Sequence, residues 1–391
     1  MPYFITVRNG GTEHLDTVAK GNEEVIGARF ADAAFFMRED SKHTLEEFLP
    51  QLDALTFHPK LGSMLDKTNR IVRLTEKIAD QMGLSADDKK EGLEAARLCK
   101  ADLATKMVVE MTSLQGIIGS YYAARSGKPP AVSQAIEEHY QPRSAEGEPP
   151  ESKPGLVVGL ADRLDSLAGL FSVGMAPSGT KDPFGLRRAA IGLVGNLIAH
   201  AVNIDLRKSI RDAADLLPVK MAAQEQATCL EFITGRLENL LLDEGYRYDV
   251  VKAVLAEQGE NPTQAAQNIR EFSGWVSRDD WDKILAAFSR CVRITRDLSE
   301  RFSVDPAAFE LAPEKSLHKA YQKVRKTAGS SYGIEVFLSN FVGMIPSIDK
   351  FFDSVLVMDE DKAIRQNRLA LLQDITSLAK GRADFSKLEG F

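Results

Sequence analysis

Apolar residues along most of this chain recur every three or four positions, the spacing that places them on one face of an α-helix. Leu160, Leu164, Leu167 and Phe171 follow this spacing and predict one buried helical stripe. Similar segments continue from about residue 45 to the C-terminus, separated by turns rich in glycine and proline. No segment of 20 to 50 residues repeats, so a solenoid is not expected. The pattern predicts an all-α fold with several helical bundles in series.

The N-terminal residues follow a different pattern. Tyr3, Ile5 and Val7 alternate with their neighbours in β-branched and aromatic company, which predicts a strand over residues 1–7. A strand cannot stand alone, so this one suggests a chain entered part-way through a larger protein. A helix is expected from about residue 21 to 37, and the clearest loop at residues 142–155.

Length and composition limit the class of protein. A chain of 391 residues should form two or three domains, and 44% hydrophobic with 27% charged residues is ordinary for a soluble protein. No apolar run is long enough for a membrane helix, and no signal peptide is visible. Cys99, Cys229 and Cys291 have no zinc-ligand spacing, which favours a reducing, cytoplasmic compartment. The formal charge of −7 means that any RNA contact must come from local basic patches.

Cations gather where a helix is expected to begin after residue 182. Asp182 is a good N-cap, and Pro183 suits the first helical position. Lys181, Arg187 and Arg188 lie around that start, although a helix N-terminus disfavours cations unless an anion joins them. Two interpretations stay open, a phosphate site or ion pairs with nearby aspartates.

Acidic residues on separate helices suggest a metal site. His58, Asp102 and Asp162 resemble parts of the H…HD…D pattern with which HD-domain phosphohydrolases hold a metal through nitrogen and oxygen ligands. Asp165 follows Asp162 by about one turn, off the apolar stripe, so both carboxylates should leave one side of their helix. A metal-dependent phosphohydrolase that uses these residues is therefore one hypothesis.

The middle of that pattern is incomplete. Ala101 stands where the histidine of the HD dyad would be, and Lys100 beside it adds a repulsive cation. We therefore expect no metal site but a degenerate HD-like helical domain. No glycine-rich loop with the spacing that cradles ATP phosphates is present either.

Three rows of basic residues occur later in the chain. They are Arg290, Arg293 and Arg296 near Phe288; Lys319, Lys323, Arg325 and Lys326 around Tyr321; and Arg365 and Arg368 beside Asn367. Such rows could bind RNA phosphates, and the aromatic residues could stack on unpaired bases. The alternative for each row is an ordinary charged helix face, and for the whole chain a helical scaffold that binds only protein.

Longer motifs make the chain similar to the β subunit of the bacterial heterotetrameric glycyl-tRNA synthetase. They include YFITV, GNEEV, ARFADAAFF, KLGSMLDKTNRI, KADLATKMVVEM, LQGIIGSYYA, LADRLDSLAGLF with PSGTKDPFGLRRAA, GYRYDVVKAVLA and IDKFFDSVLVMDEDKAIRQNRLALL. The resemblance implies ATP-dependent attachment of glycine to tRNA(Gly), with the catalytic site, ATP and Mg²⁺ on the α subunit. In that family the β subunit binds tRNA, so no catalytic residue, cofactor or metal is expected in this chain.

The resemblance also implies a domain order. We expect a remnant of a preceding domain with a connecting helix at residues 1–44, an HD-like domain at 45–205, a helical body at 206–300 and an anticodon-binding-like domain at 301–391. Family members carry further N-terminal domains, so the chain looks like the C-terminal part of a β subunit. The residues expected to contact tRNA are Lys181, Arg187, Arg188, Arg290, Arg293, Lys323, Arg365, Asn367 and Arg368.

Overall fold

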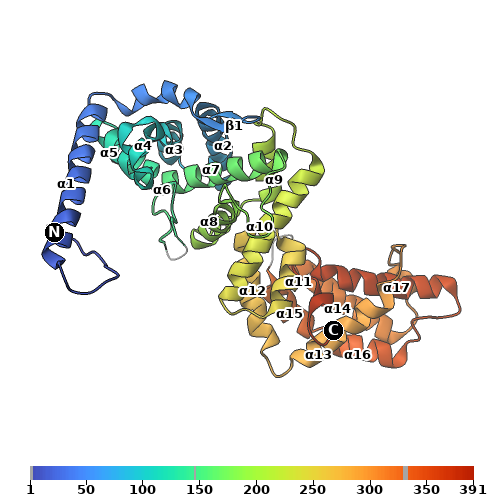
Figure 1. Cartoon of the computed structure of the whole chain (residues 1–391). Helices are drawn as coiled ribbons and strands as arrows, with labels where there is room; N and C mark the ends of the chain where they lie inside the picture. Colours follow the sequence, from blue (N-terminus) through green and yellow to red (C-terminus); the bar gives the residue numbers. More distant parts are fainter. Residues whose placement is uncertain (1–2, 145–146, 329–332) are drawn as a thin grey trace. The chain divides into compact units, whose positions relative to one another are not determined.

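The computed structural model describes residues 3–144, 147–328 and 333–391. Within these ranges nearly all regular structure is helical, which confirms the predicted all-α class (Figure 1). Contacts divide the chain into two compact units. Unit 1 comprises Met1–Met175 and Asp212–Met221, and unit 2 comprises Ala176–Arg211 and Ala222–Phe391. The four-part division expected from the sequence stays a prediction.

Unit 1 is built around one helix that is buried nearly all round. Its elements are α1 (Leu15–Asp40), η1 (Leu45–Ala54), β1 (Thr56–His58), β2 (Gly62–Ser63), α2 (Met64–Met82), α3 (Ala86–Leu98), η2 (Ala101–Ala104), α4 (Lys106–Glu110), η3 (Thr112–Leu114), α5 (Ile117–Arg125), α6 (Pro130–Glu138) and α7 (Lys153–Ser172). Helix α7 packs against α2, α3 and α6. Most of its residues are buried on every side, as in a helix enclosed by others, and these include the predicted stripe from Leu160 to Phe171.

The beginning of the chain departs from the prediction. Met1 and Pro2 lie outside the described residues, and residues 3–7 have no regular structure, with Ile5 and Val7 almost fully exposed. A strand needs a neighbour to pair with, and β1 and β2 pair with each other instead, in a small antiparallel hairpin. The helix expected over residues 21–37 is confirmed as the longer α1.

The loop expected at residues 142–155 is confirmed up to Ser152, with residues 145 and 146 outside the described ranges. Helix α7 begins directly afterwards because the Ser152 side chain accepts a hydrogen bond from the Gly155 amide. Proline at the start of the helix lacks an N–H that would have no partner there. The last loop residues therefore act as the N-cap of the central helix.

Unit 2 is a second helical assembly. Its elements are α8 (Leu186–Ala199), α10 (Ala223–Asp243), α11 (Tyr248–Gln258), α12 (Pro262–Val276), α13 (Trp281–Thr295), η4 (Pro306–Ala308), α14 (Ala312–Ala328), α15 (Ile334–Val342), α16 (Ile345–Ser354), α17 (Lys362–Thr376), η5 (Ser377–Ala379) and η6 (Phe385–Lys387), while α9 (Leu206–Ala214) crosses the boundary between the units. Its core contains a cluster of aromatic rings from Phe272, Trp281, Phe288, Phe337, Phe341 and Phe385.

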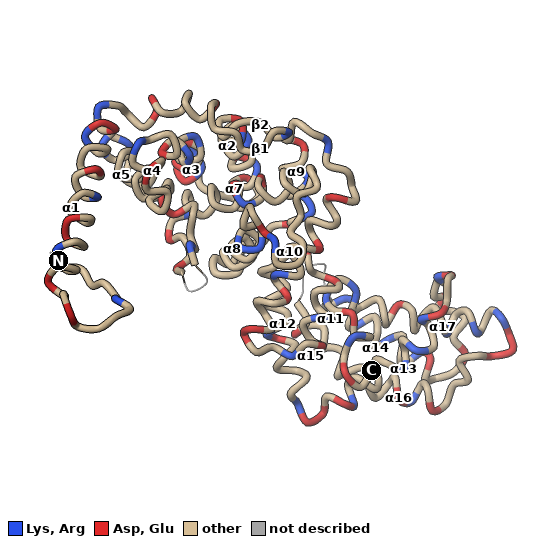
Figure 2. Tube along the Cα trace, viewed as in Figure 1, with Lys and Arg blue, Asp and Glu red and all other residues tan. Residues whose placement is uncertain are grey.

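Acidic and basic residues interleave along both units (Figure 2). Every helix in the described ranges is too short or too polar to cross a bilayer.

Candidate functional site

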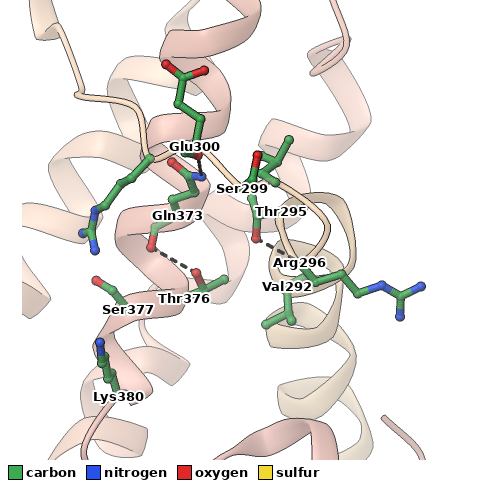
Figure 3. Close-up of a pocket in the computed structure, with 11 residues that line it drawn as sticks. Val292, Thr295, Arg296, Ser299, Glu300, Gln373, Thr376, Ser377 and Lys380 are labelled. Atoms are coloured by element: carbon green, nitrogen blue, oxygen red, sulfur yellow. Dashed lines mark hydrogen bonds between the residues drawn. The ribbon is translucent and has the colours of Figure 1, made fainter.

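A cavity of about 350 Å³ lies in unit 2 between the C-terminal ends of α13 and α17 (Figure 3). The Gln373 side chain holds one wall, since its Nε2 donates to the Glu300 carbonyl at 2.8 Å. Arg301 and Arg296 line the cavity but pair with acids, at 3.1 Å to Asp374 and 3.6 Å to Asp297. Two helix C-termini add partial negative charge. The charges nearly balance, so the cavity has no clear preference for an anion.

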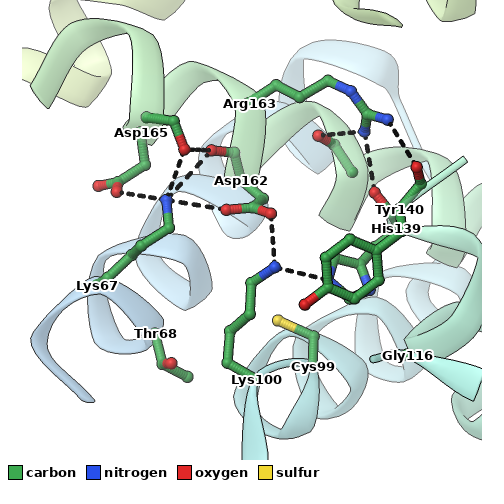
Figure 4. Close-up of polar contacts among 12 residues, drawn as sticks. Lys67, Thr68, Cys99, Lys100, Gly116, His139, Tyr140, Asp162, Arg163 and Asp165 are labelled. Atoms are coloured by element: carbon green, nitrogen blue, oxygen red, sulfur yellow. Dashed lines mark hydrogen bonds and ion pairs between the residues drawn. The ribbon is translucent and has the colours of Figure 1, made fainter. Parts of the chain in front are cut away.

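A cluster of paired charges lies inside unit 1, where the candidate metal ligands were expected (Figure 4). The Lys67 ammonium of α2 lies 2.8 Å from Asp162 Oδ1 and 3.0 Å from Asp165 Oδ2, both on α7. Lys100 donates to Asp162 Oδ2 at 2.7 Å, and both lysine side chains are no more than 5% exposed. One ammonium therefore contacts both carboxylates, which confirms that they leave the same side of α7.

Further groups complete the cluster. Arg70 Nε donates to Asp165 Oδ1 at 2.6 Å, and its Nη1 donates to the Leu61 carbonyl at 2.9 Å. His139 Nδ1 lies 2.6 Å from the Ile136 carbonyl, which requires the proton on Nδ1. His139 Nε2 is then free to accept from Lys100 at 2.9 Å. The cluster is thus a continuous network from α2 to the end of α6.

The network shifts the titration of its members. Burial alone would raise the pKa of Asp162, but the Lys100 and Lys67 ammonium groups outweigh it and hold that pKa well below the usual range. Burial, with the adjacent Lys100 charge, lowers the pKa of His139 well below its ordinary value. At neutral pH the cluster therefore contains a charged Lys100, a charged Asp162 and a neutral His139.

These residues do not fit a metal ion of the HD type. His58 accepts a hydrogen bond from the Lys60 amide at 3.2 Å within its own hairpin. Asp102 Oδ2 accepts the amides of Gly116 at 2.6 Å and Gly119 at 3.1 Å, and burial raises its pKa. The remaining carboxylate, Asp162, is already bonded to lysines. In the part of the chain that is described, no group of three or more His, Cys, Asp or Glu could hold a metal.

Sequence reasoning missed several members of this region, above all Lys67 and Arg70. A signal for Lys67 was present, because it lies one helical turn before the buried stripe of Ile71 and Leu74 and in phase with it. Arg163 was also missed. Its guanidinium donates to carbonyls at the end of α6 and in the following residues, including Gln141 at 2.6 Å, and so closes the C-terminal end of that helix.

At the helix start after residue 182, where a phosphate site was one of two open interpretations, a carboxylate of the chain binds the free amides. Helix α8 begins at Leu186, not at Pro183, with Gly185 as the N-cap at a φ of 66°. Asp182 accepts the amides of Leu186 at 2.8 Å and Arg187 at 2.9 Å. The amides that would bind a phosphate at this helix end already have an anionic partner.

The basic side chains around this turn remain at the surface. Arg187 Nη2 donates to the Gly179 carbonyl at 2.5 Å, which ties it to the preceding turn. Lys181 and Arg188 are exposed. The structure therefore brings these three expected tRNA contacts together in one turn-helix segment of unit 2.

The row on α13 is partly engaged within unit 2. Arg290 lies 3.3 Å from Asp349, with its guanidinium 4.6 Å from the centre of the Phe352 ring. Arg293 Nη2 donates to the Phe391 carbonyl at 2.6 Å. The adjacent Phe288 is only 3% exposed and belongs to the aromatic core, so the idea that it stacks on a base is wrong.

The row on α17 faces largely inward. Asn367 accepts from the Asp305 amide at 2.7 Å and donates to its carbonyl at 3.0 Å. The buried Arg368 donates to Glu314 at 2.5 Å and to Asp359 at 2.7 Å. Arg365 Nη1 donates to the Asp359 carbonyl at 2.9 Å. These side chains hold the segments around α17 in place.

The row on α14 is different. Lys319, Lys323 and Lys326 of the predicted row are exposed on one side of this helix, together with Lys315, which sequence reasoning missed. None of these four lysines forms an ion pair with another described residue, and Arg325 of the predicted row is exposed as well. The opposite side is buried through Leu317, Tyr321 and Val324. Tyr321 is only 5% exposed, so it is not available to stack on a base.

Comparison with known proteins gives a consistent result. Residues 1–256 match the family model described as glycyl-tRNA synthetase beta subunit. The chain is 40% identical over 399 residues to the glycine–tRNA ligase beta subunit of Moorella thermoacetica, with 99% of this chain and 57% of that protein covered. It is 38% identical to the beta subunit of Clostridioides difficile over the same shares, and 39% identical to the chloroplastic/mitochondrial glycine–tRNA ligase 2 of Arabidopsis thaliana, of which it covers 37%. The chain thus spans little more than half the length of its bacterial relatives.

Proposed function

Because the chain belongs to the glycyl-tRNA synthetase beta-subunit family, we propose that it acts as a tRNA(Gly)-binding part of glycine–tRNA ligase. In this proposal the ATP- and Mg²⁺-dependent attachment of glycine takes place on the α subunit, and this chain holds the tRNA. It works in the cytoplasm, within an assembly of α and β subunits of the kind found in the family, and supplies no catalytic residue of its own.

The observation that carries the proposal is the lysine row of α14. From Lys315 to Lys326 the row extends over about 16 Å of helix, long enough to meet more than one backbone phosphate. Lysines without an ion-pair partner among the described residues are available to a ligand, and each phosphate contact releases a counterion. In a chain with a net charge of −7, a row of unpaired cations is a local feature that favours a polyanion.

The other expected tRNA contacts differ in how available they are to RNA. Lys181 and Arg188 are exposed and could reach phosphates directly. Arg293 is exposed too, but it would have to share its bond to the Phe391 carbonyl with RNA. Arg187, Arg290 and Arg365 would have to share their internal partners with RNA. Asn367 and Arg368 are buried, so we assign them to positioning the segments beside α14 rather than to RNA contact.

The test is a titration of the chain with tRNA(Gly) at several salt concentrations. Lys319→Gln with Lys323→Gln should weaken binding about tenfold and reduce the slope of log K against log salt by about 1.4. The matched control, Lys90→Gln with Lys283→Gln, removes the same charge from exposed lysines that form no ion pair with another described residue. If the α14 variant keeps both the affinity and the slope of the wild type, the row does not bind tRNA.

Two further arms address the other hypotheses. A non-cognate tRNA, and addition of the α subunit, show whether binding is specific and cooperative. A chain that binds protein but no tRNA would favour the scaffold hypothesis. A phosphohydrolase is disfavoured because Lys67 and Lys100 are bonded to Asp162, the carboxylate that a metal would need. Bound metal in elemental analysis together with nucleotide hydrolysis would contradict this interpretation.

A further inference from the structure

A second cavity, of about 330 Å³, opens in unit 1 beside the turn between β1 and β2 and the first half of α2. Its cationic and polar wall is formed by Lys60, Asn69, Arg70 and Arg73, and its apolar wall includes Leu216 and Pro218. We propose that this cavity binds the phosphate group of a ligand. The inference depends on unit 1 alone and does not require the lysine row of α14 to bind RNA.

The charge available in this cavity comes from two side chains. Lys60 and Arg73 are exposed, and neither forms an ion pair with any residue in the described ranges. Arg70 lines the cavity but adds little net charge, because its guanidinium is already paired with the Asp165 carboxylate at 2.6 Å. Asp66 is the acid on the rim, and its Oδ2 is held by the Ser63 amide at 2.8 Å. The balance is a net positive charge at the mouth, which favours an anion.

Close contacts define the frame of the cavity. Gly62 has a φ of 88°, and a Cβ on it would lie 2.2 Å from Asp66 Oδ2, so the hairpin and the start of α2 are in close contact. Ser63 and Asp66 form a capping box at that helix start. A preformed frame lowers the entropy lost on binding and so favours even a small ligand.

The apolar wall is fixed as well. It belongs to the segment Asp212–Met221, which is part of unit 1 although it is remote in sequence. Asp212 tethers this segment to α2, since it accepts from Lys77 at 2.9 Å and from Gln81 at 3.1 Å. Leu216 and Pro218 therefore close one side of the cavity against water.

The chemistry of the wall favours phosphate over other anions. A phosphate monoester carries more than one negative charge, and the cavity offers two free cations to match it. The guanidinium of Arg73 presents paired N–H donors with the geometry that phosphate oxygens accept, and the Asn69 amide adds a neutral donor. The volume leaves room for a sugar beside the phosphate. The phosphate could belong to an RNA backbone or to a free phosphomonoester.

Phosphorus NMR of inorganic phosphate, titrated with the full chain at constant ionic strength, tests the proposal. The wild type should broaden and shift the resonance in a saturable way, and Lys60→Gln with Arg73→Gln should raise the dissociation constant about fivefold or more. Lys90→Gln with Arg97→Gln is the matched control, because these α3 residues are exposed and form no ion pair within the described ranges. Non-saturable binding, or equal loss in both double variants, overturns the proposal.

A second arm identifies the source of the phosphate. If the Lys60 and Arg73 variant also binds tRNA(Gly) more weakly, and phosphate competes with tRNA, the ligand is an RNA backbone. If tRNA binding is unchanged while phosphate binding is lost, the ligand is a free phosphomonoester. Variants of α14 alter only the tRNA titration, so failure of the proposed function and failure of this inference give different results.

Discussion

Replacing Lys100 with methionine tests whether its buried ammonium group stabilises unit 1 against unfolding. Methionine keeps most of the length and volume of the side chain but removes the charge. Asp162 Oδ2 then loses a donor at 2.7 Å, and His139 Nε2 loses a donor at 2.9 Å. Both groups stay in an interior where the lysine was only 4% exposed. The variant therefore leaves a carboxylate and an imidazole nitrogen with unmet hydrogen-bonding capacity.

The size of the effect follows from the partners that remain. Removing one partner of a buried ion pair typically costs about 3–5 kcal/mol, because the other charge stays buried without compensation. Asp162 retains Lys67 at 2.8 Å, and its side chain is 15% exposed. We therefore expect the lower end, a loss of about 3 kcal/mol, which corresponds to roughly a hundredfold change in the equilibrium constant of unfolding.

The measurement is urea unfolding at pH 7, combined with hydrogen exchange of the α7 amides. Exchange is needed because a chain with two units need not unfold in a single step, and α7 reports on unit 1 alone. Lys90→Met is the surface control and should stay within about 0.5 kcal/mol of wild type. A Lys100→Met variant equally close to wild type would refute a stabilising role for this ammonium.

A double-mutant cycle separates the ion pair from general packing. Asp162→Asn removes the charge that Lys100→Met leaves uncompensated, so the double variant should lose less stability than the sum of the single variants. A coupling of about 1 kcal/mol or more is expected for a contact of this kind. Simple additivity would mean that Lys100 acts through its packing and not through Asp162.

Four other outcomes follow from the structure. The pKa of His139 is near 6.5 in the unfolded chain and well below that in the folded one, so the unfolded state binds the extra proton in acid. The free energy of unfolding should therefore fall by about 1.4 kcal/mol per pH unit as the pH drops from 6.5 to 5. His139→Gln should remove this slope when unfolding by urea is measured across that pH range. Asp102→Asn should leave the stability at pH 7 unchanged or raise it, because burial raises the pKa of Asp102 and an amide oxygen can still accept from the Gly116 amide. Asp102→Ala removes that acceptor and should destabilise the protein by about 1–3 kcal/mol in the same assay. Arg368→Met should cost about 3 kcal/mol in unit 2 and leave Glu314 unpaired, and an unchanged melting curve would contradict this. Gly62→Ala should lower the melting temperature, since alanine is strained at a φ of 88° and would press on the start of α2.

The helices were predictable because their apolar spacing is strong and local. The buried stripe of α7 and the shared side of Asp162 and Asp165 both follow from a period of 3.6 residues. Features that depend on distant partners were not predictable. The described part of the strand expected over residues 1–7 has no regular structure. The start of α8 shifted to Leu186 because the Asp182 carboxylate reaches past the turn to the first amides of the helix.

Contacts of the same long-range kind disfavour the metal hypothesis. The sequence showed that Ala101 replaces the histidine of the dyad. It did not show that ammonium groups, and not a metal ion, would contact the Asp162 carboxylate. Lys67 and Lys100 are distant in sequence from Asp162, and only packing of their separate helices brings the ammonium groups to that carboxylate. Long cationic side chains reach partners that no fixed spacing along the chain specifies.

The phase of a cation relative to the apolar stripe nevertheless separates the two kinds of lysine in this chain. Lys67 lies in phase with the buried residues of α2, so it must enter the interior, where only an acid can compensate its charge. Lys319 and Lys323 lie out of phase with the buried side of α14, so they face solvent. Arg368 belongs to a run of residues that are buried without interruption, and no stripe exists there to define a phase. Expected nucleic-acid contacts are therefore best chosen on amphipathic helices, and α14 meets that condition where α17 does not.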